Sequence, residues 1–227
     1  VLMMYGLINI EALSRCVVDL LARHEALRTV VRVDEDGFPS GYLLPVPEAK
    51  TVINLIDLTS LQLEIVDDHV QQMIRSEVDK PFNLGIDLSL RVTLIRVRER
   101  ESVLIMNLHH QASDGASITV FSEELSLGYE AYSEGRAPTW NDASVRYSDW
   151  AAWQRQTLES ELSEKIERAK SRLRDVPESL ALPLDRPRVS KREHRAGYVD
   201  FHVDASIIRE LEKLAIRHST TLYTIIL

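Results

Sequence analysis

Two adjacent histidines, His109 and His110, followed closely by Asp114 and Gly115, are the residues best placed by type and spacing to do chemistry. A neutral imidazole takes up or releases a proton near neutral pH, so histidine is the most common general acid or base. Neighbouring side chains on a strand point to opposite faces, so at most one of these rings should face a given cavity. The spacing is therefore compatible with a catalytic turn in which a single imidazole acts.

The same spacing leaves two other interpretations open. A histidine beside an apolar strand is more often a hydrogen-bonded core residue than a catalyst. A histidine pair near an aspartate can also bind a metal, but adjacent histidines diverge and the three groups share no helix face, so we expect no metal site. The chain has no glycine-rich phosphate loop, and Cys16 lies in a predicted helix without a matched His–Asn set. We therefore expect no bound cofactor and no covalent nucleophile.

The flanking sequence predicts that a strand and a helix hold this turn. Residues 103–108 form an apolar run typical of a strand, and residues 88–98 alternate well enough to pair with it in antiparallel fashion. Loops held between rigid elements often carry function. After the turn, apolar residues recur at helical spacing through residues 117–133, namely Ile118, Phe121, Leu125, Tyr129 and Tyr132.

Further elements are predicted on both sides of the turn. Asn9 is a good helix N-cap, and residues 59–62 match a capping box. We expect helices from Asn9, at 59–78, at 147–173 and from about residue 208, and strands at 29–33, 42–46 and 198–203. Trp150 and Trp153 should pack between helices. Three other histidines lack a partner at motif spacing and are expected to be structural or exposed, namely His194, His202 and His218.

The order His-His-x-x-x-Asp-Gly resembles the signature of condensation domains of nonribosomal peptide synthetases, which are chloramphenicol-acetyltransferase-like acyltransferases. Other acyl- and ester-forming enzymes share that signature, so further stretches of the sequence are needed to narrow the choice of family. Residues 23–29 resemble the motif that precedes it in condensation domains, and residues 147–153 resemble the motif that follows. Residues 81–84 and 182–188 also match in their order. Five ordered matches cover most of the chain.

The resemblance implies a role for each residue of the turn. His110 is the residue expected to act on the attacking amine, as a general base or as a positioning group, and His109 is expected to be structural. Asp114 should form an ion pair that fixes the loop, with Arg28 as its candidate partner. Gly115 lies at a predicted helix N-terminus, where its N–H is a candidate donor to a developing oxyanion.

The resemblance also implies a fold and a reaction. The fold is expected to be an α/β two-layer sandwich like one lobe of chloramphenicol acetyltransferase, with the start of a second similar lobe. The reaction joins an upstream acyl thioester to a downstream amine, each carried on the phosphopantetheine arm of a peptidyl carrier domain, beside an adenylation domain. Two rivals remain: another acyltransferase of the superfamily, of an ester-forming or epimerisation type, and a non-catalytic module that docks carriers.

Composition narrows the class of protein. The chain has 227 residues, of which 44% are hydrophobic and 27% charged, as in an ordinary globular protein. Its net charge of −8 argues against nucleic acid as a partner. A single cysteine suits a reducing cytoplasm, and no membrane segment or signal peptide is evident.

The chain is expected to be a fragment made of three parts. Residues 1–174 would form the first lobe, 175–195 a proline-punctuated linker, and 196–227 the start of a second lobe. Both ends are apolar, whereas natural termini are usually polar. Such a piece should have little or no turnover, and its exposed apolar lobe face should favour self-association.

Overall fold

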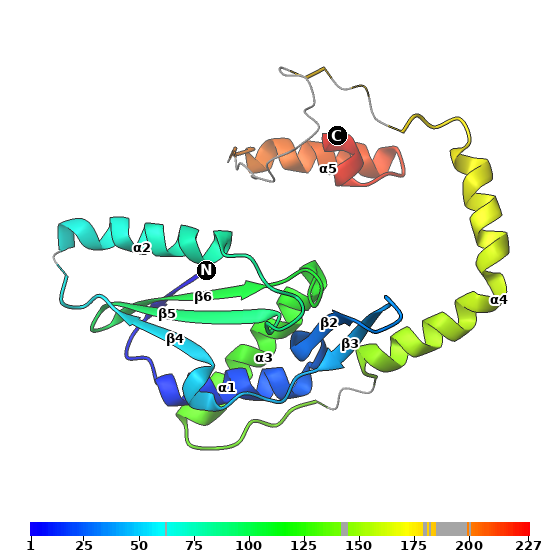
Figure 1. The fold of residues 1–227 in the computed structure, drawn as a ribbon. Coiled ribbons are helices and arrows are strands. Elements are labelled where there is room, and N and C mark those ends of the chain that lie inside the picture. The colour runs from blue at the N-terminus through cyan, green and yellow to red at the C-terminus, as the bar shows by residue number, and fades with distance from the viewer. Residues whose placement is uncertain (62, 142–144, 179–180, 182, 185–198, 200) are drawn as a thin grey trace. The chain divides into compact units, whose positions relative to one another are not determined.

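The computed structural model describes every residue except 62, 142–144, 179–180, 182, 185–198 and 200 (Figure 1). The chain divides into two compact units, Val1–Arg172 and Leu173–Leu227, which are described separately. Among the described helices, none combines the length and the hydropathy needed to cross a membrane.

The first unit is built on a four-stranded sheet. Its strands are β1 (Leu2–Tyr5), β4 (Ile53–Asp57), β5 (Leu90–Arg98) and β6 (Glu101–Leu108), in the spatial order β1-β6-β5-β4. The tight β5–β6 hairpin is antiparallel, as predicted, and β4 runs parallel to β5. Leu90 pairs with Leu108, so β6 ends beside the start of β5 and delivers the histidine turn there.

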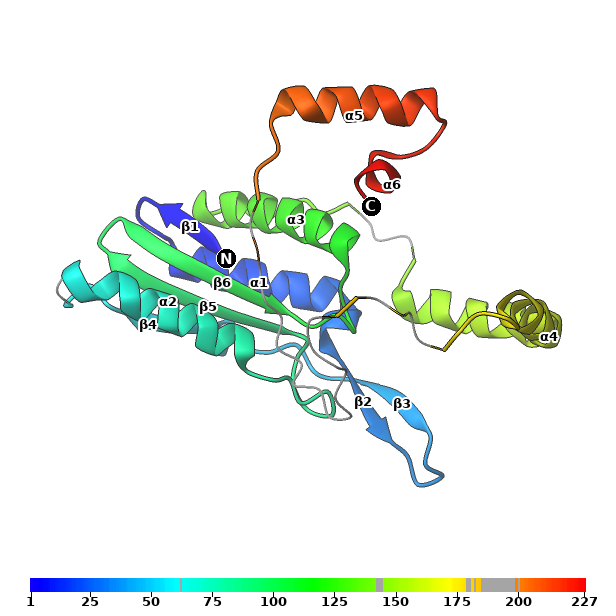
Figure 2. The same cartoon turned by 90° about the horizontal axis from the view of Figure 1, so that it is seen from above.

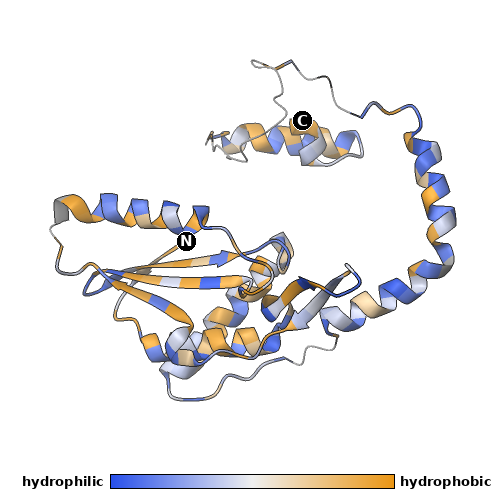
Figure 3. Ribbon diagram, in the orientation of Figure 1, coloured by the Kyte–Doolittle hydropathy of each residue, from blue (hydrophilic) through white to orange (hydrophobic). Residues whose placement is uncertain are grey.

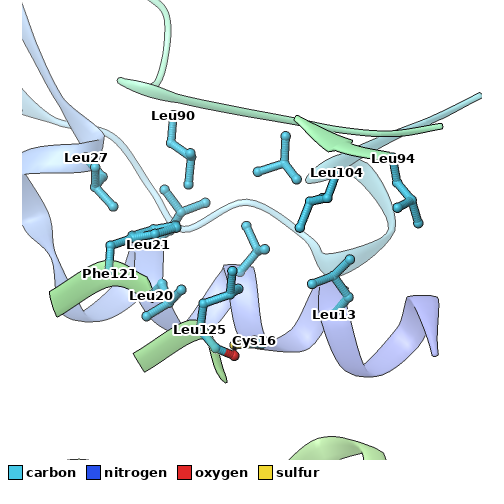
Figure 4. Packing of buried hydrophobic residues seen from close by; sticks show 12 residues of the cluster. Leu13, Cys16, Leu20, Leu21, Leu27, Leu90, Leu94, Leu104, Phe121 and Leu125 are labelled. Carbon is cyan, nitrogen blue, oxygen red and sulfur yellow. Dashed lines mark hydrogen bonds between the residues drawn. The ribbon is translucent and has the colours of Figure 1, made fainter. Parts of the chain in front are cut away.

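Helices cover both faces of this sheet (Figure 2). Helices α1 (Ile10–Arg23) and α3 (Gly115–Ser133) lie on one face, and α2 (Leu63–Asp79) lies on the other. Alternate residues of β5 point to the two helical layers. Leu94 packs with the α1 and α3 side chains (Figure 4), and Ile95 packs with those of α2. The predicted mixed α/β fold is therefore confirmed, with a helical layer on each face of the sheet.

Local sequence explains where these helices begin and what they bury. Asn9 caps α1 by accepting a hydrogen bond from the Ala12 N–H at 3.0 Å, as predicted. Helix α2 buries Val66 and Val70. The capping box predicted at 59–62 includes Gln62, which lies outside the described residues. On α3, Ile118 belongs to the apolar residues at helical spacing, yet it is 45% exposed.

A second, two-stranded sheet connects α1 to the main sheet. The short helix η1 (Glu25–Arg28) leads into β2 (Thr29–Val33), which pairs antiparallel with β3 (Pro39–Leu43). The turn between them contains Gly37 at a φ of 84°, a left-handed conformation that glycine tolerates without strain. The returning strand was predicted at 42–46 and begins three residues earlier, because this tight turn closes at Pro39. Helix η2 (Ala49–Thr51) precedes β4.

Helix α4 (Tyr147–Leu173) has the predicted bounds but not the predicted packing. Trp150 is 41% exposed and Trp153 is 60% exposed, so the expectation that both pack between helices is wrong for the part of the chain described here. The remainder of α4 is largely hydrophilic (Figure 3). Ion pairs at helical spacing, such as Glu161–Lys165 and Glu164–Arg168, support it.

The second unit contains α5 (Ala205–Arg217) and α6 (Leu222–Ile226). Helix α5 confirms the predicted amphipathic helix, with Ala215 as its buried residue. The strand predicted at 198–203 includes Tyr198 and Asp200, which lie outside the described residues, and Phe201–Val203 form no strand. His194 also lies outside them, whereas His202 is exposed and His218 is the C-cap of α5.

Helices α1 and α3 approach closely at Gly128. A methyl group at that position would overlap the Cys16 Sγ and come within 2.8 Å of the Trp140 ring. Burial raises the pKa of Cys16 to about 12, so its thiol stays protonated and packs as a small apolar group. Glycine is therefore required here for close packing, not for backbone conformation.

We expect Gly128→Ala to destabilise the first unit by about 1–2 kcal/mol, because overpacking outweighs the better helix propensity of alanine. Urea unfolding followed by circular dichroism measures this change. Ser122→Ala, at an exposed position on the same helix, is the control and should leave the midpoint nearly unchanged. An unfolding midpoint for Gly128→Ala at or above that of the parent would refute the packing argument.

Candidate active site

The turn that follows β6 is held firmly by backbone hydrogen bonds. The His109 N–H donates to the Ser89 carbonyl at 2.9 Å, which ties the turn to the start of β5. The His109 carbonyl accepts from the Ala112 N–H at 3.0 Å and from the Ser113 hydroxyl at 3.2 Å. The turn is thus fixed to the rigid sheet on one side and closes on itself on the other.

His110 is exposed, and a hydrogen bond within the turn orients its ring. Its Nδ1 lies 3.0 Å from the Ser113 carbonyl oxygen. A carbonyl oxygen only accepts, so Nδ1 must carry the proton and Nε2 must carry the lone pair in the neutral ring. His110 therefore presents an unprotonated nitrogen away from the turn, as a general base requires.

His109 is in different surroundings and in the opposite tautomer. Its half-buried Nδ1 accepts a hydrogen bond from the Gln111 N–H at 3.0 Å, so its proton lies on Nε2. Its ring meets the edge of Phe82, with a centroid distance of 5.5 Å and an interplanar angle of 72°. His109 thus contacts both the backbone of the turn and the ring of Phe82.

Phe82 is in turn held by Arg91 of β5. The guanidinium of Arg91 lies 3.8 Å from the centroid of the Phe82 ring. It also donates to the Pro81 carbonyl at 3.1 Å and to the Lys80 carbonyl. The cation, the phenyl ring and the imidazole of His109 form a continuous stack beneath the turn.

Phe82→Leu should lower the unfolding free energy by roughly 1–2 kcal/mol, because leucine keeps the apolar volume but loses both aromatic interactions. It should also speed exchange of the Gln111 amide hydrogen, since the ring of His109 would be less restrained. Hydrogen exchange followed by NMR checks both effects. Phe38→Leu, at a 67% exposed hairpin position, is the matched control, and equal exchange rates in the two variants would contradict the stack.

Asp114 closes the turn as the N-cap of α3. Its carboxylate accepts from the Ser117 N–H at 2.9 Å and from the Ser117 hydroxyl at 2.7 Å, and the same hydroxyl accepts from the Asp114 N–H. The Ser117 side chain, and then its backbone N–H, hold the pKa of Asp114 below its usual value. The carboxylate of Asp114 therefore stabilises the folded state fully at pH values above its pKa in the unfolded chain. This contribution is lost as the pH falls through the lower pKa that Asp114 has in the folded chain.

Arg28 does not pair with Asp114, so the predicted ion pair is wrong. The Arg28 side chain is 6% exposed and points at backbone carbonyls. Its guanidinium donates to Leu21 at 2.6 Å, to Ala22 at 3.4 Å and to Leu44. Two of these carbonyls belong to the last turns of α1, where a helix leaves acceptors unsatisfied and favours a cation. Arg28 therefore ties α1 to the segment after β3.

Gly115 is the first residue of α3 and is exposed. The N–H groups of a first helical turn have no acceptor within the helix, and the helix dipole favours negative charge there. A Cβ built on Gly115 would meet no other atom within 4 Å. Among the described residues, nothing therefore crowds the Cβ direction of Gly115.

A cavity of about 460 Å³ borders the turn and lies between η1, the first turns of α3 and the start of α4. We call it the η1–α3 cavity, and its wall includes Ala26, Leu27, Ala112, Val120 and Tyr147. Among the described residues, His110 does not line it. The cavity and the exposed imidazole are therefore formed by different residues of the same turn.

A charged cluster beside this cavity was not predicted from the sequence. Glu124 of α3 lies 2.5 Å from His24 Nε2 and 3.0 Å from the Arg23 guanidinium. Burial alone raises the pKa of Glu124, but the hydrogen bonds from His24 and Arg23 outweigh burial and leave this pKa below its usual value. A signal was present, because Glu124 lies between Phe121 and Leu125 on the apolar side of its helix.

Comparisons with known proteins add the following. The family model described as "Condensation domain" matches residues 1–227. One subunit of the linear gramicidin synthase of Brevibacillus parabrevis is 34% identical over 223 residues, which cover 98% of this chain and 3% of that protein. The chain therefore spans a small part of the length of such relatives.

Solved structures share the fold. The X-domain from teicoplanin biosynthesis superposes with a TM-score of 0.81 at 24% identity, covering 96% of this chain and 48% of that one. A condensation domain that mediates chain release from the enacyloxin polyketide synthase gives a TM-score of 0.68 at 20% identity, covering 98% and 41%. At these identities the structures establish a common fold.

Proposed function

Because the chain belongs to the condensation-domain family, we propose that the protein containing it forms amide bonds between two carrier-bound thioesters in a nonribosomal peptide synthetase. The observation that carries this proposal is the geometry of His110. Its ring is exposed, and its bond to the Ser113 carbonyl leaves Nε2 free to accept a proton. An unprotonated imidazole is the group that attack by an amine requires.

In the proposed reaction, the α-amine of the downstream aminoacyl group attacks the carbonyl carbon of the upstream acyl thioester. A free α-amine has a pKa near 8, so much of it is protonated at neutral pH. His110 Nε2 orients the amine and takes the proton that the new C–N bond expels from nitrogen. The C–S bond then breaks, and the proton passes to the departing thiolate. Such general-base catalysis is typically worth ~10²–10⁴ in rate.

The other turn residues act by positioning and electrostatics in this scheme. Asp114 and the stack beneath His109 fix the backbone on which His110 sits. The N–H of Gly115, at the start of α3, donates to the oxyanion that forms on the attacked carbonyl. Holding two tethered reactants in line supplies much of the remaining acceleration.

We propose peptidyl carrier domains on both sides and an adjacent adenylation domain as the partners, in the cytoplasm. Both substrates arrive on 4′-phosphopantetheine arms, and the domain itself holds no cofactor. Residues 1–174, 175–195 and 196–227 are assigned to the first lobe, the linker and the start of the second lobe. The chain spans about half of the solved domains that it matches, so the 227-residue piece should turn over slowly by itself. Exposed apolar side chains such as Trp153 favour its self-association.

Transfer between loaded carrier domains tests this function. The complete synthetase is mixed with an acyl-loaded upstream carrier and an aminoacyl-loaded downstream carrier. Mass spectrometry then measures the mass of the group on the downstream pantetheine arm. Amide formation adds the acyl mass to that arm. Transfer only to a hydroxyacyl acceptor would identify an ester-forming enzyme. Inversion of the α-carbon without transfer would identify an epimerisation domain. Carrier binding without any reaction would identify a docking module.

A further inference from the structure

Three stretches that lie far apart in the sequence meet at the η1–α3 cavity. The cavity wall contains residues 23–27 at the end of α1 and in η1, residues 112–114 of the histidine turn, and residues 145–147, which lead into α4. The first turns of α3 complete it. The turn that orients His110 therefore also forms one wall of a cavity large enough for a small organic group.

The cavity has an apolar floor and an open mouth. Leu27 and Phe121 form part of its floor and are 4% and 5% exposed. Val120, Val145 and Tyr147 also line it and remain exposed, so they form its entrance. An apolar group that enters would lose contact with water over most of its surface, which favours binding.

The charged side chains in the wall already have partners. Arg23 and His24 both bind Glu124, and Arg23 also donates to the Asn141 carbonyl at 2.8 Å. Glu25 pairs with Arg146 at 3.1 Å. Asp114 binds Ser117. A charged ligand group that entered this space would lose its hydration, and it would find the charged side chains of the wall already paired. The cavity therefore selects against charged groups.

We propose that the η1–α3 cavity is a specificity pocket for the uncharged, apolar side chain of an aminoacyl unit whose reacting atoms lie at His110. This inference rests on the proposed function and adds the class of side chain that the site takes. Two sources supply that chemistry, the upstream donor and the downstream acceptor. Both present an aminoacyl group on a pantetheine arm.

Binding to the 227-residue chain tests the pocket without requiring turnover. The probes are pantetheine conjugates of leucine, glycine and aspartate, joined through an amide in place of the thioester so that they do not hydrolyse. The methyl resonances of Leu27 and Ala112 report on the cavity, and the ring resonances of His110 report on the reacting centre. Leucyl-pantetheine should shift both sets, and it should bind at least about tenfold more tightly than the glycyl and aspartyl probes.

Val120→Trp should fill the entrance and remove the preference for leucine, while glycyl-pantetheine should bind as it does to the parent chain. Leu127→Trp is the matched control, because Leu127 is an exposed apolar residue on the same helix that does not line the cavity. If Val120→Trp does not fold, Val120→Gln removes the apolar entrance without added bulk and should weaken leucyl binding alone. Equal losses for leucyl and glycyl probes would overturn the pocket.

The outcomes separate the pocket from the proposed function. Shifts at His110 with every probe, but none at Leu27 or Ala112, would overturn the pocket and leave the function standing. No shift at His110 with any probe would count against the function itself. Comparison of leucyl-pantetheine with N-acetyl-leucyl-pantetheine identifies the source: tighter binding of the free amine indicates the acceptor, and tighter binding of the acetylated probe indicates the donor.

Discussion

His110→Ala should reduce amide formation by the complete synthetase by about 10²–10⁴-fold, with little change in the concentration of carrier at half-maximal rate. The side chain is exposed, and its main-chain neighbours are held by bonds that do not involve the ring. Removing the ring should therefore leave the turn in place and delete only the group that accepts the proton. The measurement is the initial rate of transfer between loaded carrier domains.

His69→Ala provides a control of the same chemical type. His69 is an exposed histidine on α2, and its Nδ1 bonds to the Ile65 carbonyl at 2.9 Å, much as His110 bonds to Ser113. Its loss should not change the transfer rate. A His110→Ala enzyme that transfers at more than about a tenth of the parental rate would show that orientation of the reactants alone supplies the catalysis.

Arg28→Met should destabilise the first unit by about 3–5 kcal/mol. Methionine preserves much of the apolar stem, but it leaves the carbonyls of Leu21, Ala22 and Leu44 without their shared donor. Hydrogen bonds from charged groups contribute about 1.5–3 kcal/mol each. Of the acceptors that remain, the Leu21 carbonyl is buried and the other two are partly buried. Urea denaturation gives the change in unfolding free energy.

The contrast with a surface arginine isolates the cause of that loss. Arg15 is exposed and pairs with Glu11 at helical spacing, so Arg15→Met should cost at most about 0.5 kcal/mol. Arg28→Lys should fall between the two, because an ammonium group cannot reach three separated carbonyls as a planar guanidinium does. If Arg28→Met unfolds at the same urea concentration as Arg15→Met, the hydrogen bonds from Arg28 to the three carbonyls do not stabilise the first unit.

The strand–turn–helix unit could be predicted from the sequence because its signals are local. The apolar run before His109 and the helical spacing after Gly115 gave β6 and α3 with bounds within two residues. The Asn9 cap and the amphipathic helix α5 could also be predicted from the sequence. Each depends on residues only a few positions apart, so the periodicity alone carries the information.

The partners of charged residues could not be predicted, because they depend on which elements meet in space. Asp114 and Arg28 have opposite charges and suggested an ion pair, yet a serine three residues away satisfies the aspartate and distant carbonyls satisfy the arginine. The Arg23–His24–Glu124 cluster joins residues about 100 positions apart. The prediction that Trp150 packs between helices failed in another way. Its size suggested burial, but it is exposed in the described part of the chain.

The tautomer of His110 is the most direct test of the account, because a base must offer an unprotonated Nε2. Long-range ¹H–¹⁵N correlation spectra of the 227-residue chain at a pH of about 8.5, above the ordinary imidazole pKa of about 6.5, distinguish the two ring nitrogens. His110→Ala identifies the resonances. We predict a protonated Nδ1 and a free Nε2 for His110, and the reverse for His109. A proton on Nε2 of His110 would contradict the proposed mechanism.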